Sequence, residues 1–216
     1  IYRGLVGSEM CIRDRGSNIA PIDDVRSITN HSTGTTGWSI SEYLYRMGHD
    51  VFCIAGRTQY YPNFNLPKVK YTEHPIEMLE EAVNISSSFT PEVWIFSAAV
   101  LDYVPKPSEG KIPSTKEEIQ IKMDPTQKHI PVILNATGQC YSIGFKLESN
   151  IDLEKLLEKA SSQISRYSLD AVIANRLEDL NNPESPRAWI LDSTGKSSEI
   201  SDLTSLCGII ESLIAN

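Results

Sequence analysis

The chain has 216 residues, 40% of them hydrophobic and 22% charged, which suits one globular domain large enough to bury a core. Its formal net charge is −8, from 20 Lys and Arg against 28 Asp and Glu, so binding of nucleic acid or of an anionic membrane through the overall field is not expected. The longest apolar run, residues 93–101, is shorter than the about 20 residues that a membrane helix needs. Four cysteines without CxxC pairing are typical of reduced thiols, so we expect a cytoplasmic protein.

The first fifteen residues differ in character from the rest. They show neither helical nor strand periodicity and carry no signal-peptide pattern. The stretch from Leu5 to Arg15 resembles the translation of a sequencing-library adapter. We therefore expect residues 1–15 to be a non-native segment and residues 16–216 to form a single domain. The alternative is a genuine, irregular N-terminal arm.

From residue 16 onward, predicted strands and helices alternate. Residues 16–34 are rich in Gly, Ser, Thr, Asn and Asp, which predicts a loop. Apolar residues at near-helical spacing predict helices over 38–47, 75–85 and 152–167, a short one within 126–135, and a last one capped by Ser201. Short apolar runs predict strands at 51–55, 69–71, 93–96, 141–145, 171–174 and 188–191.

A long irregular stretch follows the strongest predicted strand, 93–96. It runs from residue 98 to about 118 and contains three prolines and a glycine. Loops of this length in compact domains are usually functional. After it, Ile119, Ile121 and Met123 alternate with polar residues, which predicts a half-exposed strand.

The alternation predicts an α/β fold: a mostly parallel, Rossmann-like sheet with helices on both faces and a long active-site loop. Ligands in such folds bind at the carboxyl ends of the strands. That rule selects the loops after Ala55, Phe96, Phe145 and Ala174, together with the Gly-rich loop before the first helix.

The Gly-rich loop is the first candidate site. Residues 30–37 read Asn-His-Ser-Thr-Gly-Thr-Thr-Gly and lie directly before a predicted helix. Small residues, hydroxyls and helix N-terminal amides together favour an anion such as phosphate. The loop is neither a Walker A sequence nor a dinucleotide fingerprint, since only Gly34 and Gly37 are present. An ordinary capped loop is the alternative.

Other candidate residues lie in the loops that the topology selects. Asp102 follows the strand 93–96, where a carboxylate can accept a hydrogen bond from a base or bind a metal. Lys111, on the long loop, can act as a point charge on phosphates. Phe145 can stack on a base, and Lys159 and Asn175 belong to the same region. Each also has an ordinary structural explanation, such as a turn, a core position or a solvated surface.

Taken in order, these segments resemble the phosphopantothenate–cysteine ligase family, the second enzymatic half of the bacterial coenzyme A biosynthesis protein. The resemblance rests on residues 21–34, on Ala-Ala-Val-Leu-Asp-Tyr from 98, on Lys111-Ile112, on Gly-Phe-Lys-Leu-Glu from 144 and on Ile-Ala-Asn from 173. It implies a ligase that joins 4′-phosphopantothenate to L-cysteine through an acyl-nucleotide, using CTP or ATP and Mg²⁺. It also implies a homodimer, and no flavin, because the family's flavin-binding half has no counterpart here.

The resemblance also implies roles for single residues. Asn30 matches the asparagine that handles the acyl intermediate, and Lys111 matches the catalytic-loop lysine. The remaining matches are nucleotide-binding: Ser32, Gly34, Gly37, Ala98, Ala99, Asp102, Phe145, Lys159 and Asn175. No residue is matched as a metal ligand.

Departures from the family pattern concern mainly the N-terminus. The family's first strand and its Gly-Gly-Thr turn should precede Pro21, where Gly16-Ser17-Asn18 and the adapter-like residues stand instead. We therefore expect a ligase domain that lacks its native first, central strand. A non-catalytic or truncated nucleotide-binding module is the main functional alternative. A nicotinamide-dependent reductase is disfavoured by the missing glycine fingerprint.

Overall fold

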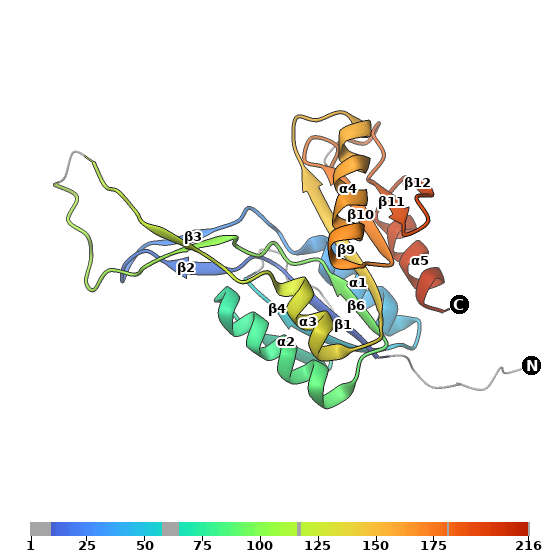
Figure 1. The fold of residues 1–216 in the computed structure, drawn as a ribbon, viewed down its shortest axis with the longest axis horizontal. Coiled ribbons are helices and arrows are strands. Elements are labelled where there is room, and N and C mark those ends of the chain that lie inside the picture. The colour runs from blue at the N-terminus through green and yellow to red at the C-terminus, as the bar shows by residue number, and fades with distance from the viewer. Residues whose placement is uncertain (1–9, 58–64, 116–117, 181, 216) are drawn as a thin grey trace, which may run out of the picture.

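A computed structural model describes residues 10–57, 65–115, 118–180 and 182–215, with the backbone alone for 10–15. Eight strands form one sheet in the order β12-β11-β10-β9-β6-β1-β4-β5 (Figure 1). The six strands from β10 to β5 are parallel, and β11 and β12 are added antiparallel at one edge. The mostly parallel sheet expected from the sequence is confirmed.

Six of the eight strands contain the apolar runs that predict them, whereas β1 and β12 were not predicted as strands. Their bounds are β1 Met10–Arg15, β4 Asp50–Ala55, β5 Lys68–Tyr71, β6 Val93–Phe96, β9 Tyr141–Glu148, β10 Ala171–Arg176, β11 Ala188–Asp192 and β12 Ser197–Ile200. All four residues of β6 are buried, as a strand covered on both faces requires.

Five helices cover the two faces of the sheet: α1 Thr35–Arg46, α2 Pro75–Phe89, α3 His129–Thr137, α4 Leu153–Tyr167 and α5 Leu203–Ile214. One core cluster joins α1 and α5 to the sheet through residues such as Trp38, Leu44 and Ile210. The other joins α2, α3 and α4 to the opposite face through Met78, Ile133 and Leu156. The helices therefore form the two outer layers that the alternating pattern predicts.

The central position of the sheet is occupied by β1. Its backbone pairs in parallel with β4 on one side, where Cys11 is opposite Val51, and with β6 on the other, where Cys11 is opposite Val93. We expected the native strand to be missing at this position. The structure places residues 10–15 there, so the position is filled, and the foreign origin of those residues stays a prediction.

The turn after β1 bonds to the loops that follow β4 and β6 at the carboxyl edge of the sheet. Ser17 and Arg57 exchange backbone hydrogen bonds, and the Ala99 N–H donates to the Gly16 carbonyl at 2.8 Å. Gly16 has a φ of 79°, and a Cβ there would lie 2.7 Å from the Arg57 carbonyl oxygen. Only glycine fits this approach without movement of the neighbouring chain.

Two segments that the sequence predicts as loops contain short two-stranded ribbons. Residues 16–34 include a hairpin of β2 Ile19–Pro21 and β3 Ser27–Thr29, and the long loop begins and ends in a second ribbon of β7 Tyr103–Pro105 and β8 Met123–Pro125. The strand predicted at 119–123 is wrong except for Met123, since Ile119 and Ile121 are exposed and lie outside any strand. Figure 1 shows the ribbons and the loop between β7 and β8 projecting from the sheet as an arm.

The last helix also differs in detail. The N-cap of α5 is Asp202, whose carboxylate accepts a hydrogen bond from the Ser205 N–H at 2.8 Å, rather than Ser201. Ser201 instead donates its hydroxyl to Asp202. A carboxylate is favoured at this place because it satisfies a helix N–H and complements the helix dipole.

Candidate functional site

A cleft of about 1350 Å³ opens at the carboxyl end of the sheet, next to the N-terminus of α1. Its walls come from the turn after β1, the loops that follow β4 and β6, the carboxyl ends of β9 and β10, the segments that lead into α1 and α3, and one side of α4. Ten of the eleven residues selected from the sequence line it: Asn30, Ser32, Gly34, Gly37, Ala98, Ala99, Asp102, Phe145, Lys159 and Asn175. Residues up to 145 positions apart are thus brought to one place.

The Gly-rich loop forms the wall at the start of α1. Gly34 is the N-cap residue with a φ of 75°, a left-handed conformation that favours glycine. No side chain caps this helix; the Ser32 and Thr33 hydroxyls instead accept hydrogen bonds from the N–H groups of Gly34 and Thr35. The positive end of the helix dipole therefore meets the cleft beside several hydroxyls, an arrangement that favours an anionic ligand.

Asn30 connects this loop to the segment after β6. Its Nδ2 donates to the carbonyl oxygens of Ala99 at 3.1 Å and Val100 at 3.0 Å. The same segment is fixed from the other side by the turn after β1, through Ala99 and Gly16. Asn30 thus holds two walls of the cleft in a fixed relation.

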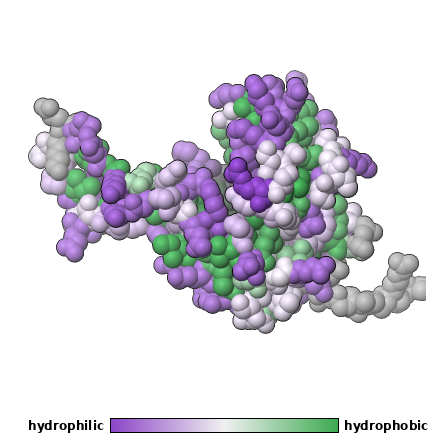
Figure 2. Space-filling view, in the orientation of Figure 1, coloured by the Kyte–Doolittle hydropathy of each residue, from purple (hydrophilic) through white to green (hydrophobic). Residues whose placement is uncertain are grey.

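The charged lining is cationic although the chain is acidic. Six Lys and Arg residues line the cleft against two carboxylates: Arg57, Lys128, Lys146, Lys159, Arg166 and Arg187 against Asp102 and Glu148. Figure 2 shows hydrophilic residues gathered over the part of the molecule that carries α4. A polyanion would find a local positive field here, independent of the net charge.

Lys159 and Lys146 share one carboxylate. Glu148 accepts hydrogen bonds from Lys146 Nζ at 2.8 Å and from Lys159 Nζ at 2.7 Å. Burial opposes ionisation of Glu148, yet the two ammonium groups outweigh it and lower the pKa of this carboxyl. Lys159 is therefore held at the rim of the cleft with its charge only partly compensated.

Asp102 is also paired within the cleft. Its Oδ1 accepts a hydrogen bond from Lys128 Nζ at 2.5 Å, and this bond raises the pKa of Lys128. Both side chains are more than half exposed, so the pair is accessible to a ligand. A base that donates to Asp102 would meet a carboxylate whose second oxygen is still available.

Several charged residues of the cleft were not selected from the sequence, and three of them show why. Arg187, just before β11, donates from Nη2 to the Thr36 hydroxyl at 2.9 Å and so reaches the start of α1 from 151 positions away. Partial burial lowers its pKa. Lys128 and His129 lie at the start of α3. No motif marks these residues, because their position depends on contacts between distant segments.

Lys111 is the exception among the selected residues. It lies on the loop between β7 and β8, next to Ile112, whose backbone bonds to the β2–β3 turn, and it does not line the cleft. Figure 1 shows that loop extending away from the sheet. Within one chain, the structure does not bring Lys111 together with the other ten residues.

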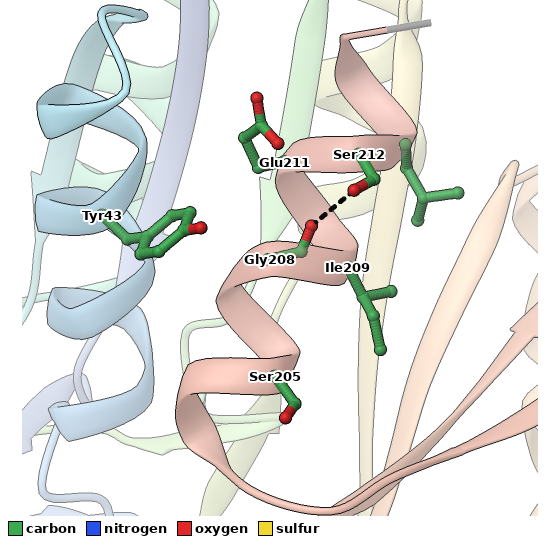
Figure 3. Close-up of a pocket in the computed structure, with 7 residues that line it drawn as sticks. Tyr43, Ser205, Gly208, Ile209, Glu211 and Ser212 are labelled. Carbon is green, nitrogen blue, oxygen red and sulfur yellow. Dashed lines mark hydrogen bonds between the residues drawn. The ribbon is translucent and has the colours of Figure 1, made fainter.

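A second, shallow depression lies between α1 and α5. Figure 3 shows Tyr43 of α1 pointing toward Gly208 of α5, with Glu211 and Ser212 nearby. The Ser212 hydroxyl donates to the Gly208 carbonyl at 2.8 Å within the helix. This depression has one carboxylate and no cluster of cationic groups among its lining residues, so the cleft is the stronger candidate site.

The described ranges show neither a metal-binding cluster nor a membrane-spanning helix. These contain no group of three or more His, Cys, Asp or Glu that could hold a metal ion. Asp102 and Glu148 are each paired with lysines. The described helices include none long and apolar enough to span a bilayer.

The chain is similar in sequence to proteins of coenzyme A biosynthesis. Residues 5–205 match the family model described as "DNA/pantothenate metabolism flavoprotein C-terminal domain". A coenzyme A biosynthesis bifunctional protein, CoaBC of Methanocaldococcus jannaschii, is 31% identical over 170 residues, which cover 75% of this chain and 39% of that protein. The chain thus spans about two fifths of the length of the curated relatives it matches.

Solved structures share the fold. The DNA/pantothenate metabolism flavoprotein from Streptococcus pneumoniae superposes with a TM-score of 0.84 at 22% identity, covering 97% of this chain and 100% of that one. A Cab2 mutant in complex with phosphopantothenate-cysteine superposes with a TM-score of 0.75 at 17% identity, covering 96% of this chain and 87% of that one. At these identities the likeness establishes the α/β architecture.

Proposed function

The chain belongs to the DNA/pantothenate metabolism flavoprotein C-terminal domain family, and from that premise we propose that it is a phosphopantothenate–cysteine ligase. A carboxylate oxygen of 4′-phosphopantothenate attacks the α-phosphorus of a nucleoside triphosphate, and pyrophosphate leaves. The amine of L-cysteine then attacks the acyl carbon, a proton is lost, and the nucleoside monophosphate leaves with the oxygen that joined the two.

The convergence of the ten selected residues on one cationic cleft carries this proposal. A triphosphate and a phosphorylated acid are both polyanions, and the cleft is the described surface where a helix N-terminus and several cations meet. The phosphopantothenate-cysteine held by the Cab2 mutant is the product that this reaction would give.

We assign the residues to three tasks. Ser32, Gly34 and Gly37 receive phosphate at the start of α1, with Lys159 as a nearby cation. Ala98, Ala99, Asp102, Phe145 and Asn175 accept the nucleoside. Asn30, between these two groups, is assigned to the acyl intermediate; its Nδ2, which here donates to the Ala99 and Val100 carbonyls, would have to release one of them to donate to that intermediate.

Mg²⁺ is part of the proposal without assigned protein ligands. The described residues offer no cluster of ligands for it, which fits a cation held mainly by substrate phosphates and water. The choice between CTP and ATP stays open. A cytoplasmic location is proposed because Cys53 and Cys140 are thiols rather than disulfide partners; binding of flavin, of nucleic acid or of a membrane is not part of the proposed function.

We further propose that the chain acts as a homodimer. The loop that carries Lys111 projects away from the cleft of its own chain, and Tyr103, Ile119 and Ile121 on the arm are exposed apolar residues. Contact of the arm with a second copy would cover these residues and let the loop close partly against the partner chain. Lys111 would then reach substrate as a charge on the phosphates.

Pyrophosphate release tests the proposed function. The chain is incubated with Mg²⁺, 4′-phosphopantothenate and CTP or ATP, with and without L-cysteine. A ligase releases pyrophosphate continuously only when all three substrates are present. A non-catalytic nucleotide-binding module would bind the nucleotide and release none in any mixture, which would overturn the proposal.

A further inference from the structure

The turn between β2 and β3 contains a carboxylate with an unusually complete set of partners. The Asp23 side chain is fully buried. Its Oδ1 accepts hydrogen bonds from the N–H groups of Val25 at 3.0 Å and Arg26 at 2.8 Å, which closes the hairpin turn. The Arg26 guanidinium donates to Oδ2 from Nε at 2.9 Å and Nη2 at 2.5 Å, and holds the pKa of Asp23 well below its usual range.

The same pair reaches across to the loop between β7 and β8. Asp23 Oδ2 also accepts the N–H of Ile112 at 3.0 Å, and Arg26 Nη2 donates to the Ile112 carbonyl at 2.6 Å. Both backbone groups of Ile112 are therefore held by one ion pair. A third bond, from the Ser108 N–H to the Ile22 carbonyl at 3.0 Å, fixes the loop a few residues earlier.

Lys111 lies between these two attachment points. Its neighbour Ile112 is fixed on one side and Ser108 on the other, while Lys111 itself is exposed. The two oxygens of Asp23 have different hydrogen-bond partners. Oδ1 accepts from N–H groups within the turn, and Oδ2 accepts from the Arg26 side chain and from the loop. The turn alone needs only Oδ1, so the contact to Ile112 is an additional feature of this carboxylate.

We propose that Asp23 and Arg26 are positioning residues that clamp the backbone beside Lys111 and so set where its ammonium group is presented. This rests on the proposed function for the role of Lys111, but the clamp itself does not. A charge acts on a developing transition state only if it is placed to within a fraction of an ångström, and a fixed backbone reduces the freedom that must be lost on closure.

Hydrogen exchange at the Ile112 amide tests the clamp without any substrate. Asp23→Asn replaces one carboxylate oxygen by an N–H₂ group, so it cannot serve both the turn and the loop. We expect exchange at Ile112 to rise at least about tenfold, a loss typical of one broken charge-assisted bond, while β6 amides keep their protection. Asp24→Asn, at the exposed neighbouring position, is the matched control and should leave Ile112 unchanged. Unchanged exchange at Ile112 in Asp23→Asn would overturn the clamp.

A double-mutant cycle then tests positioning. In the otherwise unchanged chain, Asp23→Asn should lower kcat about tenfold, while the nucleotide KM stays within about threefold of the wild-type value. In a chain that already carries Lys111→Gln, Asp23→Asn should lower kcat by less than about twofold. Arg26→Lys, which keeps the charge but not the planar fork, should behave likewise. Independent, multiplying losses would show that the pair does not act through Lys111. A wild-type chain with no ligase activity would refute the proposed function, while the exchange measurement would still decide the clamp.

Discussion

Asn30 shows how a single amide can organise two walls of a cleft. Its Nδ2 donates to two carbonyl oxygens of the segment after β6, which keeps the Gly-rich loop and that segment at a fixed separation. Replacing it removes both an organising contact and the amide that would face the acyl intermediate.

The substitutions Asn30→Ala and Lys111→Gln should have different consequences. Asn30→Ala should lower turnover by about 10²-fold, because the proposed contact to the acyl intermediate is lost, and should weaken nucleotide binding less, because the other residues proposed to bind the nucleotide remain. Lys111→Gln should slow formation of the acyl-nucleotide, since a charge on the phosphates is lost. Single-turnover and steady-state kinetics separate the two effects. Turnover near that of the wild type in both variants would remove their catalytic assignment.

His129 gives a prediction that does not depend on the reaction. Burial lowers the pKa of this imidazole to about 4 despite a hydrogen bond to the Pro75 backbone, and its Nδ1 has no partner among the described residues. Between about pH 4 and 6.5 the unfolded chain therefore binds more protons than the folded chain, so stability falls as the pH is lowered through this range.

Urea unfolding at pH 7 and pH 5 measures this effect. The contribution of His129 to the loss of unfolding free energy should be on the order of 1–2 kcal/mol. His129→Gln should reduce the loss by that amount. An undiminished pH dependence in His129→Gln would contradict the assignment.

Among the strands, β1 occupies a central position where apolar residues are usually required. It pairs on both edges, in a sheet covered by helices on both faces, where continuous Val- and Ile-rich strands are usual. Its sequence, Met-Cys-Ile-Arg-Asp-Arg, contains three charged residues in six. We infer that the fold tolerates this strand at a cost in stability.

Replacing residues 10–15 by a Val/Ile-rich strand of the same length should raise the melting temperature by at least about 5 °C, which corresponds to about 1–2 kcal/mol or more for a domain of this size. Ligase activity should be kept or increased, because the Gly16 turn is retained. Thermal unfolding followed by circular dichroism measures the difference. Equal melting temperatures would show that residues 10–15 suit this position as well as an apolar strand does.

The elements that could be predicted from the sequence are those whose residues are buried together. The strand β6 is apolar throughout and β10 is apolar over its first four residues, so their pattern admits few other structures. The β2–β3 and β7–β8 ribbons are three residues per strand, partly exposed and free of clear alternation, so nothing in the sequence marks them. The cleft residues were predictable because strand ends converge in an α/β sheet, whereas the Arg187–Thr36 contact depends on tertiary packing.

In the whole molecule, the cationic cleft and the loop with Lys111 lie in different places. The net charge is −8, yet the cleft collects six cations against two carboxylates. The arm extends from the body and carries Lys111 away from that cleft. A single copy therefore holds the residues proposed to bind the nucleotide and the loop lysine in separate places, and the proposed dimer would bring these parts together.

Light scattering at micromolar concentration should give about twice the mass of 24.1 kDa that one chain has. The measurement is best made on the chain with an apolar β1, so that instability of residues 10–15 does not obscure association. Tyr103→Glu or Ile121→Glu on the arm should weaken the dimer by placing a charge in its contact, whereas Ile76→Glu, on the exposed surface of α2, should not. A monomeric mass for the chain with an apolar β1 and no substitution on the arm would refute the dimer.

Transfer of oxygen from substrate to product tests the central claim most directly. 4′-Phosphopantothenate labelled with ¹⁸O in its carboxylate is incubated with the chain, Mg²⁺, L-cysteine and CTP or ATP, and the products are analysed by mass spectrometry. If the acid is activated as an acyl-nucleotide, one labelled oxygen per turnover appears in the nucleoside monophosphate, together with one molecule of phosphopantothenoylcysteine. Label in inorganic phosphate, or no amide product in a chain that binds the nucleotide, would contradict the account.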